Sequence, residues 1–198
     1  MAKIKAFKGL RPVKDKAHLV ASRPYDVLNS EEARIEADGN PYSFLHVVKP
    51  EIDLPVDADH YSAAVYEKAK NNFQRLVEDD VFFQDKKECL YIYELTMNGR
   101  SQTGLVACAA VEDYLNNVIK KHELTRPDKE EDRKNHVRVS MMNAEPVFFA
   151  YPAVEFIDKI VERAKENESE YDFTAEDGII HRFWKIDDDN VVQLLIDE

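Results

Sequence analysis

The fold class of this 198-residue chain is decided by ECLYIYELTM-Asn98-Gly99-RSQTGLVACAAV, which spans residues 88–111. Two runs rich in β-branched and aromatic residues flank the Asn-Gly dipeptide. An Asn-Gly pair between such runs is a strong hairpin signal, because the two-residue turn needs positive φ at both positions. The sequence therefore predicts two antiparallel strands that turn at residues 98–99.

Further strands are predicted from short apolar runs. YDFTAEDGIIHRFWKI, residues 171–186, indicates a second hairpin that turns at Glu176-Asp177-Gly178. Residues 3–13 indicate a short strand that enters a turn. FLHVVKP (44–50) and VFFAYP (147–152) are predicted to be single strands, the first followed by an exposed acidic loop.

Amphipathic patterns predict helices between these strands. Apolar residues recur at helical spacing over residues 60–80 and 153–167. Ser30, followed by two glutamates, predicts a helix N-cap, and Gly39-Asn40-Pro41 predicts the end of that helix. DDDNVVQLLIDE (187–198) predicts a last, N-capped helix. The irregular order indicates an α+β class with a mixed, largely antiparallel sheet, two β-hairpins and flanking amphipathic helices.

Composition and charge restrict the function classes. Hydrophobic residues make up 44% and charged residues 33%, as in a globular domain. The 39 acidic against 27 basic residues give a net charge of −12, which disfavours nucleic acid as a partner because its phosphates must be neutralised. No apolar run approaches the roughly 18 residues that cross a bilayer, and MAKIKAFKGL lacks the apolar core of a signal peptide. We therefore expect a cytoplasmic protein without a membrane partner.

The cysteines and known motifs do not define a reaction. Cys89 and Cys108 both lie in apolar, strand-like runs, so both are predicted to be buried, reduced thiols. Two thiols without clustered histidines do not make a zinc site, and no metal ligands are predicted. No phosphate-binding Gly-rich loop, dinucleotide fingerprint or nucleophile elbow occurs. The chain is expected to form a single domain, 1–198, with a sub-boundary near residues 140–150.

The segment KKHELTRPDKEEDR, residues 120–133, gathers cations in an otherwise acidic chain. It holds five Lys or Arg, five Asp or Glu and one His. A local concentration of cations suits an anionic ligand. Alternating charge is also typical of a helix that is simply exposed to solvent, and both interpretations stay open.

A helix start within this segment would align its cations. Thr125 is predicted to be the N-cap and Pro127 to lie in the first turn, with Asp128 three positions after the cap. Lys129, Arg133 and His136 then share one face, and Arg126 lies one turn before Lys129. Free amide donors and the helix dipole would add to this stripe, so it suits a phosphate or carboxylate.

Several side chains near the stripe are candidates for proton transfer. Glu123 and Asp132, beside cations, would stay ionised and could accept a hydroxyl proton or hold Mg²⁺. His122 could shuttle a proton near neutral pH. Asp26 would line a site or occupy a turn, and Arg11 would bind an anion or cap a turn.

The chain resembles the bacterial family catalogued as domain of unknown function 1015. The resemblance covers nearly the whole chain and is most specific in its charged segment. It implies a relation to the ParB/sulfiredoxin-like nucleotide-handling fold, which includes kinases that phosphorylate free serine with a nucleotide donor. The strings that carry it are FKGLRP (7–12), RPYDVLNSEEA (23–33), NPYSFLHVVKPEIDLP (40–55), QTGLVACAAVEDY (102–114) and VIKKHELTRPDKEEDR (118–133).

The resemblance implies an ATP- or ADP-dependent phosphotransferase, such as a kinase of free serine or another small hydroxylated metabolite, with Mg²⁺. A nucleotide- or anion-binding regulatory module without catalysis and a protein-interaction domain are the alternatives. In phosphoryl transfer, cations would hold the phosphates and Glu123, Asp132 or His122 would handle the proton. The positions that match the family pattern are Lys120, His122, Glu123, Thr125, Lys129, Asp132 and Arg133, followed by Asp26 and Arg11.

The resemblance also bears on the length of the protein. Family members continue beyond the position of Glu198 to an Ala-Asp-Gly-His-His-Arg motif that is similar to a phosphate-binding turn of that fold. We therefore expect the chain to be the N-terminal part of a longer protein. It departs from the family at Ala144-Glu145, where a Thr-Gly pair is usual.

Overall fold

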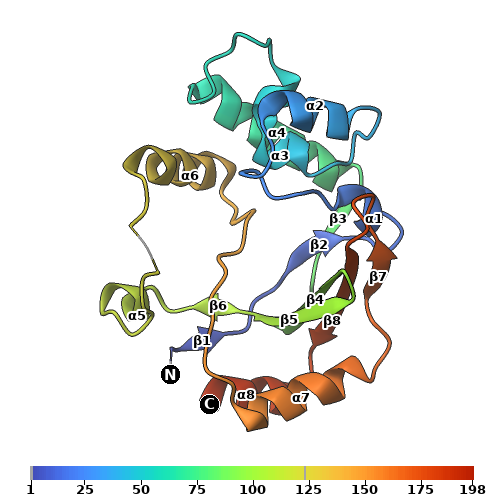
Figure 1. Ribbon diagram of the computed structural model, residues 1–198, viewed down its shortest axis with the longest axis vertical. Coiled ribbons are helices and arrows are strands. Elements are labelled where there is room, and N and C mark those ends of the chain that lie inside the picture. Colours follow the sequence, from blue (N-terminus) through green and yellow to red (C-terminus); the bar gives the residue numbers. More distant parts are fainter. Residues whose placement is uncertain (1, 123) are drawn as a thin grey trace. The chain divides into compact units, whose positions relative to one another are not determined.

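The hairpin predicted at Asn98-Gly99 forms in the computed structural model, which describes residues 2–122 and 124–198 (Figure 1). Strand β4 (Leu90–Met97) pairs antiparallel with β5 (Arg100–Val106). The φ angles of Asn98 and Gly99 are 53° and 77°. Positive φ at both central residues is the requirement of a type I′ turn, so the Asn-Gly pair fixes the register of the hairpin.

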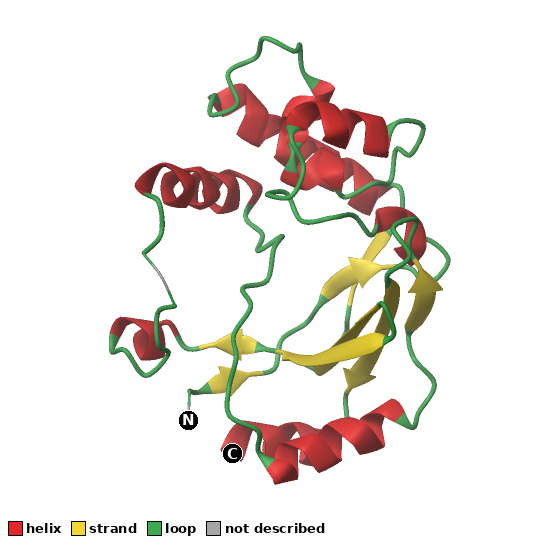
Figure 2. Ribbon diagram, viewed as in Figure 1, coloured by secondary structure: helices red, strands yellow, loops and turns green. Residues whose placement is uncertain are grey.

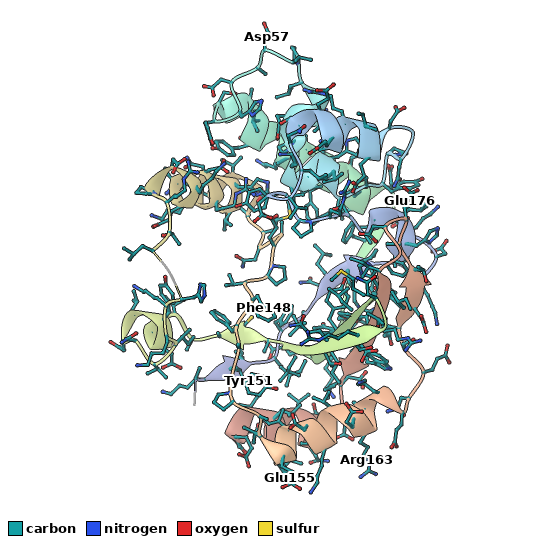
Figure 3. All side chains as sticks on the ribbon, in the orientation of Figure 1. Asp57, Phe148, Tyr151, Glu155, Arg163 and Glu176 are labelled. Carbon is teal, nitrogen blue, oxygen red and sulfur yellow. The ribbon has the colours of Figure 1, made fainter. Side chains whose placement is uncertain are left out.

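The second predicted hairpin completes a four-stranded antiparallel sheet of order β5-β4-β8-β7. Its strands are β7 (Tyr171–Thr174) and β8 (Ile180–Ile186), and Figure 3 shows Glu176 at the turn between them. Figure 2 shows that the chain contains both helices and strands. The predicted α+β class with two hairpins is therefore confirmed.

The chain divides into two compact units, each built from separate segments. The first comprises residues 1–14, 84–123 and 150–198, and the second comprises 15–83 and 124–149. The first unit holds the four-stranded sheet, whereas the second is mainly helical (Figure 2). Each unit has its own buried apolar cluster.

Two helices cover one face of the sheet in the first unit. They are α7 (Glu155–Lys165) and α8 (Asp189–Asp197), and both match predicted helices. Figure 3 shows Glu155 and Arg163 pointing from α7 away from the sheet. The core between helices and strands comprises Leu90, Ile92, Ile157, Val161, Trp184, Ile186, Val192 and Leu195.

The remaining elements of the first unit are short. Strand β1 (Ile4–Lys5) pairs with β6 (Cys108–Ala109), and β2 (Leu10–Pro12) and α5 (Val111–Leu115) complete the unit. Cys89 is buried as predicted, but the prediction for Cys108 is wrong, because it is exposed. Its strand has only two residues and pairs with β1, which leaves its side chain uncovered.

Helix α4 (Ala63–Glu78) is the centre of the second unit and contacts α3 (Leu45–Val48), α6 (Pro127–Ser140) and the 3₁₀ helix η1 (Pro50–Asp53). The apolar spacing over residues 60–80 predicted it. The strand β3 (Phe82–Gln84) follows α4 where the chain passes from the second unit into the first. The helices of the second unit are α1 (Ala17–Val20), α2 (Ser30–Ala37), α3 (Leu45–Val48), η1 (Pro50–Asp53), α4 (Ala63–Glu78) and α6 (Pro127–Ser140).

Both single-strand predictions from short apolar runs are wrong. FLHVVKP forms α3, with the amide of Val48 donating to the carbonyl of Phe44 at 3.0 Å. An apolar run this short does not separate strand from helix periodicity. VFFAYP forms no strand, and the side chain of Phe148 stays exposed (Figure 3). β-prone residues form a strand when a partner strand is present, and this segment has none.

The predicted N-cap of α2 is displaced by one residue. Asn29 is the cap, and its side chain accepts hydrogen bonds from the amides of Glu31 and Glu32 at 2.9 Å. The hydroxyl of Ser30 donates instead to Glu51 at 2.9 Å. Of the helices in the described residues, none combines the length and the apolarity that crossing a bilayer requires.

Candidate functional site

The predicted basic helix exists as α6, but it starts one residue later than its predicted cap. Arg126 is the N-cap and Pro127 is the first helical residue. The hydroxyl of Thr125 donates to the carboxylate of Glu130 at 3.0 Å, so it does not cap the helix. Arg126 pairs with exposed Asp128. The part of the predicted stripe nearest the helix start is therefore a local ion pair on the surface.

The following turns of α6 line a small pocket of about 80 Å³ within the second unit. We call it the Arg133 pocket. Lys129, Arg133 and His136, which helical spacing predicted to share a face, come from α6, and so does Asp132. The other lining residues come from the segments before α2, around η1 and at the start of α4: Tyr25, Val48, Lys49, Pro50, Glu51, His60, Tyr61, Val65 and Tyr66.

The guanidinium of Arg133 is fixed from two sides. Its Nε and Nη2 donate to Asp132 Oδ2 at 3.1 and 2.8 Å, and its Nη1 donates to Glu145 at 2.8 Å. The ring of Tyr25 lies 4.1 Å from the guanidinium carbon. Burial opposes the charge of Arg133, but these carboxylates outweigh it and raise its pKa. These bonds use three of its five N–H groups, so two donors remain for a ligand.

Asp132 supports Arg133 from within the unit. Asp132 is 8% exposed, and its other oxygen, Oδ1, accepts a hydrogen bond from the Tyr66 hydroxyl at 3.0 Å. Burial and this contact raise the pKa of Tyr66 to about 12, so the phenol stays protonated. Both oxygens of Asp132 are thus engaged, which suits the positioning of Arg133 more than proton abstraction.

Lys129 differs from the other pocket cations in its partner. Its ammonium lies 3.3 Å from the hydroxyl of Tyr61 and 5.8 Å from the centre of that ring. Within the described part of the chain, no carboxylate forms an ion pair with Lys129. Its charge is therefore available to a ligand.

Lys49 brings a third cation to the Arg133 pocket. Its ammonium lies 3.0 Å from Glu51 Oε1, and both side chains are largely buried. The same glutamate oxygen accepts from Ser30. Because η1 places Lys49 and Glu51 on the pocket wall together, the pair adds no net charge but supplies donors.

His136 closes the pocket as a buried, neutral imidazole. It is 3% exposed, and its Nε2 lies 2.9 Å from the carbonyl oxygen of Val47. A carbonyl only accepts, so Nε2 carries the proton and the lone pair of the neutral ring is on Nδ1. Burial lowers the pKa of His136 despite that hydrogen bond. The ring is thus a candidate proton acceptor.

The remaining predicted residues lie elsewhere. Asp26 is exposed in a turn of the second unit. Lys120 and His122 belong to the first unit and are exposed, and the ammonium of Lys120 donates to the carbonyl of Asn117 at 2.7 Å. Glu123 lies outside the described residues, so the structure gives no position for this predicted base.

Arg11 is fully occupied in the first unit. It donates to Asp85 through Nε and Nη2 at 2.8 and 3.1 Å, and to the hydroxyl of Tyr171 at 2.9 Å. Glu170 adds an ion pair at 3.0 Å. Arg11 is 9% exposed, and these partners raise its pKa despite burial. It therefore acts as a buried clamp between segments of the first unit.

The pocket offers no ready metal site. Among residues 2–122 and 124–198, no three His, Cys, Asp or Glu side chains gather where they could hold a metal ion. The carboxylates that line the Arg133 pocket, Glu51 and Asp132, already accept from Lys49 and Arg133. The residues present thus do not fit a resident Mg²⁺ ion.

The pocket residues that come from outside α6 were not predicted from the sequence. Lys49 and Glu51 were hidden because their segment was assigned to a strand and an exposed loop. The charges of Lys49 and Glu51 flank Pro50 directly after an apolar run, and this pattern was the signal that could have identified them. Glu145, which was not among the predicted site residues, proves to be a partner of Arg133.

Comparisons with known proteins identify the family of the chain, but they identify no similar curated protein or solved structure. The sequence model of the family described as "Protein of unknown function (DUF1015)" matches residues 4–198. Neither a search of curated proteins nor a search of solved structures found a match. The chain therefore belongs to the DUF1015 family.

Proposed function

We propose that this member of the DUF1015 family binds the phosphoryl end of ATP, ADP or a related phosphate in the Arg133 pocket. We further propose that it transfers a phosphoryl group to a small hydroxylated metabolite such as free serine. The observation that carries the proposal is the convergence of Lys49, Lys129 and Arg133 on one pocket, where Lys129 has a tyrosine hydroxyl as its partner.

The size of the pocket suits a phosphoryl group. A volume of about 80 Å³ is well below the roughly 300–1,000 Å³ of sites that enclose a whole small molecule. The base and ribose of a nucleotide would therefore lie outside the pocket. The ring of Tyr61, which is 52% exposed and lies beside Lys129, offers a surface for stacking there.

Phosphoryl transfer requires positioning and charge stabilisation more than covalent chemistry from the protein. In the proposed reaction the acceptor oxygen bonds to phosphorus as the phosphorus–oxygen bond to the nucleotide breaks. Lys129 and the two remaining N–H groups of Arg133 would stabilise the charge on the phosphoryl oxygens. Nδ1 of His136 would accept the hydroxyl proton, with Glu123 and His122 as the alternatives predicted from sequence. Because the pocket residues do not fit Mg²⁺, the positive charge at the phosphoryl oxygens would come from Lys129 and Arg133.

A binding module without turnover is the second candidate. The engagement of both Asp132 oxygens favours it, because a carboxylate held by Arg133 and Tyr66 is a poor base. Either function suits the cytoplasmic location expected from the sequence. The two candidates predict the same phosphate binding and differ in whether the nucleotide is consumed.

Calorimetry and a turnover assay separate these functions. ATP and ADP, each with and without Mg²⁺, are titrated into the wild type, and phosphorus NMR then follows nucleotide consumption with a panel of free amino acids and other hydroxyl compounds. We expect saturable binding that Lys129→Gln weakens and Lys134→Gln, on the same helix and paired with Glu130, leaves unchanged. Acceptor-dependent consumption supports the phosphotransferase. Binding without it supports the module, and no binding contradicts both.

A further inference from the structure

The second unit contains a second, larger cavity of about 430 Å³. This volume lies within the range of sites that hold a small molecule. As far as the structure describes the chain, its lining has no residue in common with the Arg133 pocket. The walls come from the end of α2, the loop after it, α3 and η1: Arg34, Ala37, Asp38, Gly39, Asn40, Pro41, His46, Ile52 and Asp53.

Arg34 presents a fixed and uncompensated positive charge to this cavity. Its Nε donates to the carbonyl of Ile52 at 3.1 Å, and its Nη2 donates to the carbonyls of Glu51 and Leu54 at 2.9 and 3.2 Å. These acceptors are neutral, and no carboxylate of residues 2–122 or 124–198 forms an ion pair with Arg34. They orient the guanidinium without neutralising it, and both N–H groups of Nη1 remain for a ligand.

The other charges on the wall largely cancel. His46 Nδ1 lies 2.8 Å from Asp53 Oδ1, and its Nε2 lies 3.2 Å from the carbonyl of Asn40. The other oxygen of Asp53, Oδ2, lies 4.0 Å from the ammonium of Lys68, and this ion pair offsets the charge of Asp53. Asp53 also accepts from Asn72 at 2.6 Å. Burial raises the pKa of Asp53, but His46, Asn72 and Lys68 together outweigh burial and lower that pKa. Asp38 is exposed, so water screens its charge.

We infer that this cavity binds a small organic carboxylate. The carboxylate accepts from Nη1 of Arg34, and the carbon skeleton lies against Ala37, Pro41 and Ile52. A guanidinium held by carbonyls gains a charge-assisted hydrogen bond from such a ligand. A cation in the same place would be repelled by Arg34. The inference rests on Arg34 and its surroundings, so it stands whether or not the Arg133 pocket binds phosphate.

Amide NMR of the full chain tests the site with a panel of acetate, butyrate, succinate and benzoate, matched to the corresponding neutral amides. We expect at least one carboxylate, and not its amide, to give saturable shifts at residues 37–40, 46, 52 and 53. Shifts that stay absent for every carboxylate up to tens of millimolar overturn the inference, and so do equal shifts with the amides.

Two variants test the role of charge. Asp38→Asn removes an exposed rim charge and should tighten carboxylate binding about twofold, since exposed charges interact weakly. Asp57→Asn, at an exposed carboxylate on a loop outside the cavity, should not change carboxylate binding (Figure 3). Arg34→Met should weaken binding at least about tenfold, as expected for the loss of a charge-assisted hydrogen bond.

The Asp38→Asn variant tests the inference even if Arg34→Met does not fold. Weaker binding in Asp38→Asn shows that the cavity prefers a cation and overturns the inference. A folded Arg34→Met variant, checked by circular dichroism, that binds as tightly as the wild type also overturns it.

Discussion

Arg11 in the first unit and Arg133 in the second have nearly the same partners but differ in what they leave exposed. Each guanidinium holds an aspartate through two nitrogens, pairs with a glutamate and lies near a tyrosine ring. The Arg11 side chain is 10% exposed, whereas that of Arg133 is 28% exposed and lines a pocket with an available lysine. The partners alone do not distinguish a structural arginine from a binding one. The two kinds of arginine are distinguished by the N–H donors that still face a cavity.

The largest expected effect is the replacement of Arg11 by methionine. It leaves Asp85 buried without its cation, and breaking a buried ion pair in this way costs about 3–5 kcal/mol. Denaturant unfolding should show this loss of stability. The double variant Arg11→Met/Asp85→Leu should recover part of it, because the unpaired charge is removed. A single variant as stable as the wild type would show that Arg11 is not a clamp.

Arg133→Met should reduce stability less than Arg11→Met does, but it should also weaken phosphate binding. Because Arg133 is partly exposed, we expect a loss of about 1–2 kcal/mol in unfolding free energy, between the values of surface and buried pairs. Phosphate or nucleotide affinity should fall at least about tenfold, because charge-assisted hydrogen bonds are lost. Calorimetry measures both the unfolding free energy of this variant and its affinity for phosphate or nucleotide. Unchanged affinity would place Arg133 in the same structural class as Arg11.

The stability of the second unit should fall below about pH 6.5 because of His136. Burial lowers the pKa of His136 in the folded chain below its ordinary 6.5. The unfolded chain therefore binds more protons as the pH falls through 6.5, and the stabilising contribution present above that pH is lost as the folded pKa is approached. Unfolding at pH 7.5 and 5.5 should show this difference. His136→Gln, which keeps a donor for the Val47 carbonyl, should reduce it, and an unchanged pH dependence in that variant would contradict the account.

Lys129→Gln should give the smallest effect on stability while still weakening phosphate binding. The Lys129 side chain is exposed and its partner is a tyrosine hydroxyl, so thermal unfolding should stay within experimental error. Phosphate affinity should fall about threefold to tenfold, as for one screened charge at a surface pocket. A large change in melting temperature would show that Lys129 is a structural residue.

Local signals allowed both hairpins and the longer helices to be predicted. Asn98-Gly99 specifies its own turn, and α4 and α7 each have enough residues to show a 3.6-residue period. The short runs 44–50 and 147–152 do not. Their conformation depends on which segments cover them, and that is a property of the tertiary structure.

The candidate site likewise combines features that local sequence predicts with features that depend on the tertiary structure. Helical spacing within α6 was enough to bring Lys129, Arg133 and His136 together. It did not reveal Lys49 or Glu145, because those residues approach from other segments. The family resemblance also suggested anion binding for both Arg11 and Arg133, and the difference between them depends on burial, which the sequence does not state.

The most direct test of the account is a phosphate and pyrophosphate titration followed by amide NMR on the full chain. We predict saturable shifts at residues 25, 49, 61 and 129–136, and none at residues 11, 85, 170 and 171. Shifts confined to the surroundings of Arg11, or none at residues 129–136 at any phosphate concentration, would contradict the claim that the pocket of Arg133 is the anion site.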